Sequence, residues 1–125
     1  MMKYSKIKEG IMIFLITFLL SYSVSKYLKL VFKIPRPCKG LPNCPANYSF
    51  PSTHATVAFA LATSFSFLIK RYRLLLFLAA ALITAQRVYL GFHTLKDVAF
   101  GSLLGFAIGL VVMKIWKLFN YRINK

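Results

Sequence analysis

The chain has 125 residues, of which 58% are hydrophobic and 16% aromatic, and its formal charge is +15 because 17 basic residues face only two acidic ones. This length allows one domain, residues 1–125, and the apolar content is too high for an ordinary soluble domain. The positive charge suits an anionic partner, which for a membrane protein means lipid headgroups and phosphate rather than nucleic acid.

Four apolar segments follow one another along the chain. They run from Ile11 to about Leu28, from Ala55 to Ile69, from Leu74 to Phe92, and from Val98 to Met113 and on toward Phe119. Each approaches the roughly 20 residues that a helix needs to cross the hydrocarbon of a bilayer. Buried helices of a soluble protein are the alternative, but four such segments leave no residues for a polar shell. We therefore predict an all-α integral membrane bundle of four transmembrane helices.

The basic residues predict the orientation of this bundle. Four crossings place the N-terminus, the turn 70–73 and the C-terminal tail on one side, and the loop 29–50 and the turn 92–96 on the other. The first side carries ten of the 17 basic residues: Lys3, Lys6, Lys8, Lys70, Arg71, Arg73, Lys114, Lys117, Arg122 and Lys125. Because Lys and Arg are enriched in cytoplasmic loops, we predict cytoplasmic termini and an extracytoplasmic long loop in the cell membrane.

The only two cysteines, Cys38 and Cys44, lie in this long loop. An extracytoplasmic compartment permits a disulfide between them. Two unpaired thiols and half of a metal site are the alternatives, although no further cysteine is present. The sequence offers no cluster of metal ligands, so we expect no metal and no other cofactor.

Polar residues gather at three places on the predicted outer side. Lys29 precedes Arg36-Pro37, the sequence Pro51-Ser52-Thr53-His54 opens the second helix, and Arg87, His93 and Asp97 span the turn into the fourth helix. A charged side chain at the centre of a membrane helix costs about 2.5–3.5 kcal/mol on insertion scales, so its presence indicates a function. The alternating topology predicts that these three groups meet at one level of the membrane.

Phosphate is the ligand that such a set would bind. Lys29, Arg36 and Arg87 can neutralise a phosphate dianion, and helix N-termini at Ser52 and near Thr94 favour bound anions. If the chain is helical from His93 onward, the Asp97 carboxylate can orient the imidazole as a nucleophile. From another helix, His54 can protonate the leaving oxygen and later deprotonate a water molecule.

Each residue also has a purely structural explanation. Thr94 and Asp97 fit a loose capping box, Pro51-Ser52 is an ordinary helix start, and Lys29 can anchor a helix end at the membrane surface. Only the joint spacing of the three groups, on one predicted side of the membrane, favours a catalytic site.

These residues resemble the type 2 phosphatidic acid phosphatase superfamily, whose three motifs are K-x6-R-P, P-S-G-H and S-R-x5-H-x3-D. The spacing and order agree across residues 29–97. The resemblance implies metal-independent hydrolysis through a phosphohistidine, with His93 as nucleophile, Asp97 as its orienting partner and His54 as general acid. It implies phosphate-binding roles for five residues: Lys29, Arg36, Ser52, Thr53 and Arg87.

The chain departs from this family pattern in three ways. Thr53 stands where the family usually has glycine, Gln86 replaces serine, and four predicted helices stand where many members have six, the missing pair being expected before Lys3. Gly101, Gly105 and Gly109 form a stripe of small residues suited to close helix packing. We expect this packing to lie within the chain, with a homo-oligomer as the alternative.

The sequence therefore predicts a phosphatase that acts on a membrane lipid phosphate or diphosphate at the extracytoplasmic face. A polyprenyl diphosphate, such as an undecaprenyl or dolichyl carrier, is the first candidate substrate, and phosphatidylglycerophosphate or phosphatidic acid is the next. A non-catalytic cationic membrane protein that binds anionic lipid is the alternative from another class, but it would leave the spacing of His93 and Asp97 unexplained.

Overall fold

The computed structural model describes residues 2–123, without the side chains of residues 2 and 3. Its elements are α1 (Met2–Phe32), α2 (Thr53–Leu68), the short 3-10 helix η1 (Lys70–Tyr72), α3 (Arg73–Tyr89) and α4 (Leu95–Ile123). No strand occurs in this range, and the predicted all-α class is confirmed. Of the basic residues used to predict orientation, Lys125 and the Lys3 side chain lie outside the described part.

The helix ends differ from the apolar segments in both directions. Helices α1 and α4 extend well beyond them, because long basic side chains at a helix end can lie along apolar surface and still reach polar surroundings. Helix α3 stops at Tyr89 rather than Phe92, since Gly91 has a φ of +79°, a left-handed conformation that glycine adopts readily.

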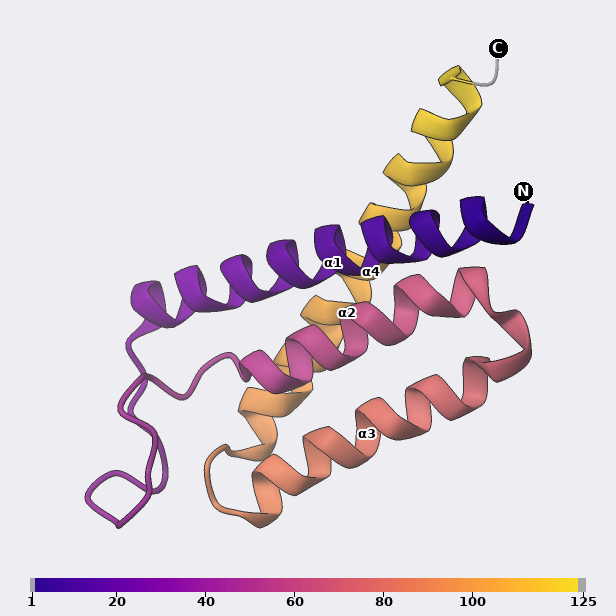
Figure 1. Cartoon of the computed structure of the whole chain (residues 1–125). Coiled ribbons are helices and arrows are strands. Elements are labelled where there is room, and N and C mark those ends of the chain that lie inside the picture. Colours follow the sequence, from indigo (N-terminus) through magenta and orange to yellow (C-terminus); the bar gives the residue numbers. More distant parts are fainter. Residues whose placement is uncertain (1, 124–125) are drawn as a thin grey trace.

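Three of the helical segments are long and apolar enough to span a membrane: Tyr4–Phe32, Lys70–Tyr89 and Leu95–Ile123. Helix α2 is apolar but has only 16 residues. It lies between the other helices and packs against α1, α3 and α4 (Figure 1). Large apolar side chains of α1, α3 and α4 stay exposed on the outer surface, as expected for helices that face lipid.

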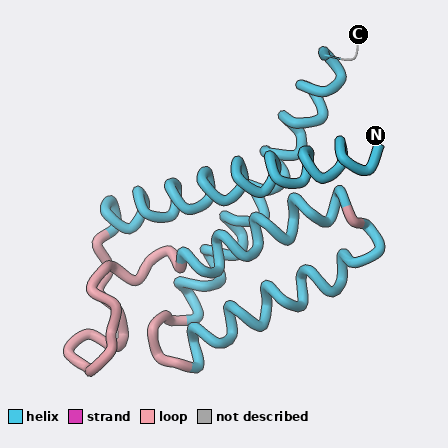
Figure 2. The backbone as a smooth tube through the Cα atoms, in the orientation of Figure 1, coloured by secondary structure: helices cyan, strands magenta, loops and turns pink. Residues whose placement is uncertain are grey.

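The chain runs back and forth, so its connections gather at two ends. Both termini and the α2–α3 turn lie at one end, and the long loop 33–52 and the turn 90–94 lie at the other, which we call the loop end (Figures 1 and 2). Far from the loop end, the indole of Trp116 in α4 donates a hydrogen bond of 2.8 Å to Glu9 in α1. The arrangement matches the alternation predicted from the sequence.

The glycine stripe of α4 lies directly against α2. A Cβ atom added to Gly105 would come within 2.2 Å of the Thr56 carbonyl oxygen, and one added to Gly101 within 2.8 Å of the Ser52 carbonyl oxygen. Gly109 likewise faces Thr63. The stripe therefore serves packing within the chain, because α2 occupies it.

Helix α1 meets α2 through a row of small polar residues spaced four apart. Thr17, Ser21 and Ser25 are fully buried, and the row continues to Lys29, which is 2% exposed. The hydroxyl of Thr17 lies 3.0 Å from that of Ser64 in α2. Hydroxyl pairs of this kind hold membrane helices together, and here they fix the face of α1 that packs against α2.

Candidate active site

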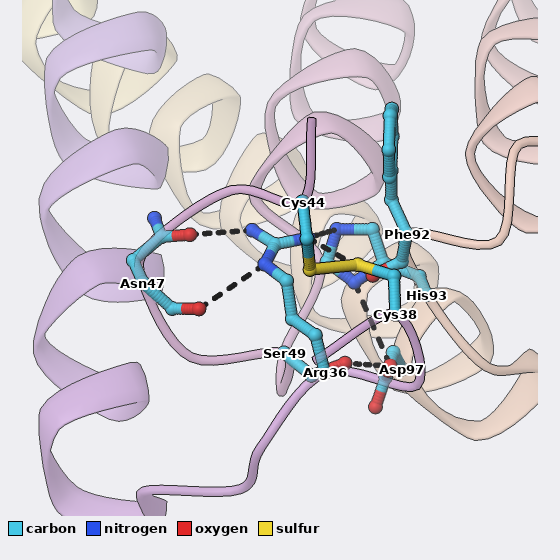
Figure 3. The surroundings of a disulfide bond; sticks show 8 residues. All are labelled: Arg36, Cys38, Cys44, Asn47, Ser49, Phe92, His93 and Asp97. Atoms are coloured by element: carbon cyan, nitrogen blue, oxygen red, sulfur yellow. Dashed lines mark hydrogen bonds and ion pairs between the residues drawn. A yellow bond between two sulfur atoms is a disulfide. The ribbon is translucent and has the colours of Figure 1, made fainter. Parts of the chain in front are cut away.

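Arg36 lies at the loop end and contacts the turn before α4 (Figure 3). Its Nη1 atom donates a hydrogen bond of 2.9 Å to the Phe92 carbonyl oxygen and lies 3.0 Å from Nε2 of His93. A guanidinium can only donate, so Nε2 must be the acceptor and the proton of a neutral imidazole must sit on Nδ1. The lone pair of Nε2 therefore points toward Arg36.

Asp97 lies on the other side of the His93 ring. One of its oxygens, Oδ2, accepts hydrogen bonds from the Ser49 hydroxyl and, at 2.8 Å, from the Thr94 backbone N–H, and lies 3.5 Å from His93 Nδ1. The Asp97 N–H donates to the Thr94 hydroxyl at 3.3 Å. The predicted capping box and the predicted approach of Asp97 to His93 therefore coexist.

Asp97 approaches His93 although the helix predicted to start at His93 begins only at Leu95. Because Thr94 and Ser49 hold the carboxylate, Nδ1 of His93 makes no hydrogen bond to any described residue. The carboxylate nevertheless faces the Nδ1 side of the ring, where it can fix the tautomer.

Lys29 reaches this region from the last turn of α1. Its ammonium donates to the Tyr48 carbonyl oxygen at 2.8 Å and lies 3.5 Å from that of Ser49. The side chain is almost fully buried, so its role is not that of a lysine anchored at a membrane surface.

The start of α2 is fixed from two sides. Ser52 is the N-cap, its hydroxyl accepts from the Ala55 N–H at 3.2 Å, and its own N–H donates to the Asp97 carbonyl oxygen at 3.2 Å. The Thr53 hydroxyl lies 2.7 Å from that of Ser25 in α1. The threonine at the family's glycine position thus supplies a hydrogen bond between helices.

His54 and Arg87 lie at the edge of the cluster. His54, in the first turn of α2, is exposed and lines an apolar groove of about 360 Å³ together with Phe18 and Tyr22 of α1 and Ile83 of α3. The guanidinium of Arg87 lies 4.7 Å above the Phe92 ring, and its buried Nε has no hydrogen-bond partner within residues 2–123. Neither residue bonds directly to His93, and Gln86 is exposed.

The electrostatics of this site favour an anion. Burial, and after it the cations Arg36 and Lys29, lower the pKa of His93 to about 4, and Asp97 only partly opposes them. Burial, and then the charge of Arg87, lower the pKa of the Arg36 guanidinium. His93 is consequently a neutral imidazole at physiological pH, surrounded by positive charge that a phosphate group would neutralise.

Two residues of the site were not found from the sequence. Asn47 accepts two hydrogen bonds from Arg36, and Ser49 donates one to Asp97. Both lie in the loop beside the disulfide that joins Cys38 and Cys44 (Figure 3). Neither belongs to a motif or a periodic pattern, so the sequence alone held no signal for them.

Comparisons with known proteins found a matching family and two similar solved structures. The PAP2 superfamily matches over residues 10–121. The crystal structure of Aquifex aeolicus LpxE is similar with 32% identity and a TM-score of 0.72, covering 86% of this chain and 68% of that one.

The crystal structure described as the first transmembrane PAP2-type phosphatidylglycerolphosphate phosphatase, from Bacillus subtilis, is similar with 25% identity and a TM-score of 0.64, covering 90% of this chain and 59% of that one. The chain thus spans roughly three fifths to two thirds of the length of these two structures. No match was found among the curated proteins compared.

Proposed function

The chain belongs to the PAP2 superfamily, and we propose that it is a membrane phosphatase that hydrolyses a lipid phosphate or diphosphate through a phosphohistidine on His93. The observation that carries this proposal is the contact of 3.0 Å between Arg36 Nη1 and His93 Nε2. It requires a lone pair on the ring nitrogen that faces the cations, which is the condition for attack on a phosphate bound there.

The proposed reaction has two steps. Nε2 of His93 attacks phosphorus, the bond from phosphorus to the lipid oxygen breaks, and His54 donates a proton to that oxygen. His54 then takes a proton from water, the resulting hydroxide attacks the phosphohistidine, and the phosphorus–nitrogen bond breaks to release inorganic phosphate. Asp97 stabilises the positive charge that forms on the His93 ring.

The three basic residues would stabilise the transferring phosphoryl group. Lys29, Arg36 and Arg87 supply the positive charge, and the N-terminal amides of α2 after Ser52 supply further donors. The buried Nε of Arg87, which has no partner among the described residues, could donate to a phosphate oxygen, and Arg36 could exchange its contact with His93 Nε2 for one with the phosphate. These residues would stabilise the phosphoryl group without a metal ion, and phosphate release in excess chelator tests this.

The substrate is proposed to be a lipid because an apolar groove begins beside His54. A lipid chain in this groove would place its phosphate next to the cationic cluster, as expected for a site with an apolar wall and a few polar groups. Polyprenyl diphosphate is the first candidate substrate. Phosphatidylglycerophosphate is the second, favoured by the similarity to the Bacillus subtilis phosphatase.

The basic residues favour cytoplasmic termini and hence an active site on the extracytoplasmic face of the cell membrane. The common location of both termini, opposite the loop end, is consistent with this orientation. A disulfide in the loop is typical of an oxidising compartment and supports the same side.

The proposal is tested by phosphate release from purified protein in detergent with excess chelator, using polyprenyl diphosphate, phosphatidylglycerophosphate and phosphatidic acid in parallel. Release from at least one lipid without added metal is expected, and acid-labile phosphate on His93 should accumulate when the reaction is quenched early. A protein that retains bound lipid but releases no phosphate from any of them would instead support a lipid-binding role.

The acidic limb of the pH profile is expected to lie unusually low. His93 must be neutral to attack, and its pKa of about 4 lies far below the 6.5 of an ordinary histidine. In the kcat/KM profile, which reports the free enzyme, the loss assigned to His93 should therefore begin only near pH 4. An acidic limb near pH 6.5 would instead indicate a His93 that titrates like an exposed histidine, which would contradict the burial of this ring.

The same shift predicts a stability effect. Because the folded pKa is depressed, the unfolded chain binds more protons between about pH 4 and 6.5. The contribution of His93 to stability is thus fully present above pH 6.5 and is lost as the pH falls to about 4. The unfolding temperature of the wild type should fall more steeply over this range than that of His93→Gln.

A further inference from the structure

The segment Asn47–Ser49 lies in the loop between α1 and α2, outside the three motifs that identify the family. Its first residue binds Arg36, its middle carbonyl binds Lys29, and its last hydroxyl binds Asp97. These three charged groups come from different parts of the chain. One short segment therefore connects two of the phosphate-site cations to the acid that faces His93.

Asn47 holds the guanidinium of Arg36 on two of its three nitrogens. Nε donates to the Asn47 carbonyl oxygen at 3.1 Å, and Nη2 donates to its Oδ1 at 2.5 Å (Figure 3). The third nitrogen, Nη1, is thereby directed at Phe92 and His93. Four of the five N–H groups of Arg36 are used in this way, and one on Nη2 remains for a phosphate oxygen.

Ser49 fixes the other end of the segment. It is fully buried, its N–H donates to the Ile34 carbonyl oxygen at 2.8 Å, and its hydroxyl donates to Asp97. Since backbone and side chain are both bonded, the segment cannot shift without breaking contacts to the site.

The disulfide lies within the stretch of chain that separates Arg36 from Asn47. It joins Cys38 to Cys44, with Cα atoms 5.7 Å apart, and so closes the loop between the two partners. A closed loop has fewer alternative conformations, which favours the pairing of Arg36 with Asn47.

From these contacts we propose that Asn47 and Ser49 are positioning residues of the phosphate site, with Asn47 orienting Arg36 toward the bound phosphate and Ser49 orienting Asp97. This inference rests on the proposed phosphatase function. In this proposal neither residue would touch the phosphate itself. Asn47 acts through Arg36, and Ser49 acts through Asp97.

The test is a double-mutant cycle on Asn47 and Arg36, measured as the affinity for inorganic phosphate by titration calorimetry of the purified protein in detergent. Asn47→Ala is expected to weaken phosphate binding about tenfold, because a charge-assisted hydrogen bond that orients Arg36 is lost. In an Arg36→Lys background, which lacks the guanidinium, Asn47→Ala should cause less than about a twofold further loss. Asn120→Ala, near the far end of α4, is the matched control and should bind like the wild type.

Lipid turnover gives the second readout. Asn47→Ala should raise KM more than it lowers kcat, while its unfolding temperature in detergent stays near that of Asn120→Ala. Equal phosphate affinity in Asn47→Ala and the wild type, or full additivity in the Arg36→Lys background, would overturn the inference, as would a wild type that binds no phosphate. A wild type that binds phosphate but hydrolyses none of the lipids would refute the proposed function alone, and the cycle would still test the positioning.

Discussion

Replacing His93 with alanine is expected to lower phosphate release by about 10⁴-fold or more, because the proposed covalent intermediate cannot form without its nucleophile. The ring is 3% exposed and contacts Arg36, so the substitution also leaves a small cavity beside the cations. The rate is measured in detergent with a lipid that the wild type hydrolyses. Binding of inorganic phosphate should survive far better than turnover, since Lys29, Arg36 and Arg87 remain.

His93→Gln is the appropriate companion variant, because glutamine fills more of the space and can still accept a hydrogen bond from Arg36. It should be as inactive as His93→Ala and should carry no acid-labile phosphate. If either variant kept a rate within tenfold of the wild type while folded, the assignment of His93 as nucleophile would have to be abandoned. His54 would then be the next nucleophile to consider.

Asp97→Asn is expected to be inactive for a different reason. The carboxylate accepts from Ser49 and from the N–H of Thr94 at 2.8 Å, and an amide in its place loses the charge that would stabilise a positive His93 ring. Turnover should fall strongly although His93 is intact. Asp97→Asn should still form some phosphohistidine on His93, whereas His93→Ala should form none, which separates the orienting role from the nucleophilic one.

Two kinds of local pattern in the sequence predict the helices and the residues of the site. Apolar runs of nearly membrane-spanning length located all four helices, and the alternation of the chain placed Lys29, Arg36, His93 and Asp97 at one end. Both patterns are expressed along the sequence itself. The helix ends were less accurate, because they depend on details such as the left-handed Gly91 that stops α3.

The contacts made by the long loop could not be predicted in this way. Asn47 meets Arg36 across 11 positions, and Ser49 meets Asp97 across 48. Such pairs depend on the path of an irregular segment, for which neither helical nor strand periodicity exists. The bond between Thr53 and Ser25 escaped prediction for another reason: both residues lie in helices, and their contact depends on how α1 packs against α2. The partner of Thr53 lies on α1, outside the family motif, so the motif alone could not explain why threonine replaces glycine there.

Replacing Gly105 with alanine is expected to destabilise the protein by about 3 kcal/mol. The added Cβ would lie 2.2 Å from the Thr56 carbonyl oxygen and 2.9 Å from the Ala60 backbone nitrogen. Both are backbone atoms of α2, so no side chain can rotate away and α4 must separate from α2. The change is measured as the unfolding temperature and the fraction of monodisperse protein in detergent.

The loss of stability should extend to the proposed active site, because α2 and α4 each contribute to it at the loop end. Separation of the two helices breaks the bond of 3.2 Å between the Ser52 N–H and the Asp97 carbonyl oxygen, so phosphate binding should weaken even in the folded fraction. Gly10→Ala is the matched control: nothing lies within 4 Å of its added Cβ, and the gain in helix propensity is worth up to about 1 kcal/mol. Equal unfolding temperatures for Gly105→Ala and Gly10→Ala would mean that α2 and α4 are not in contact at Gly105.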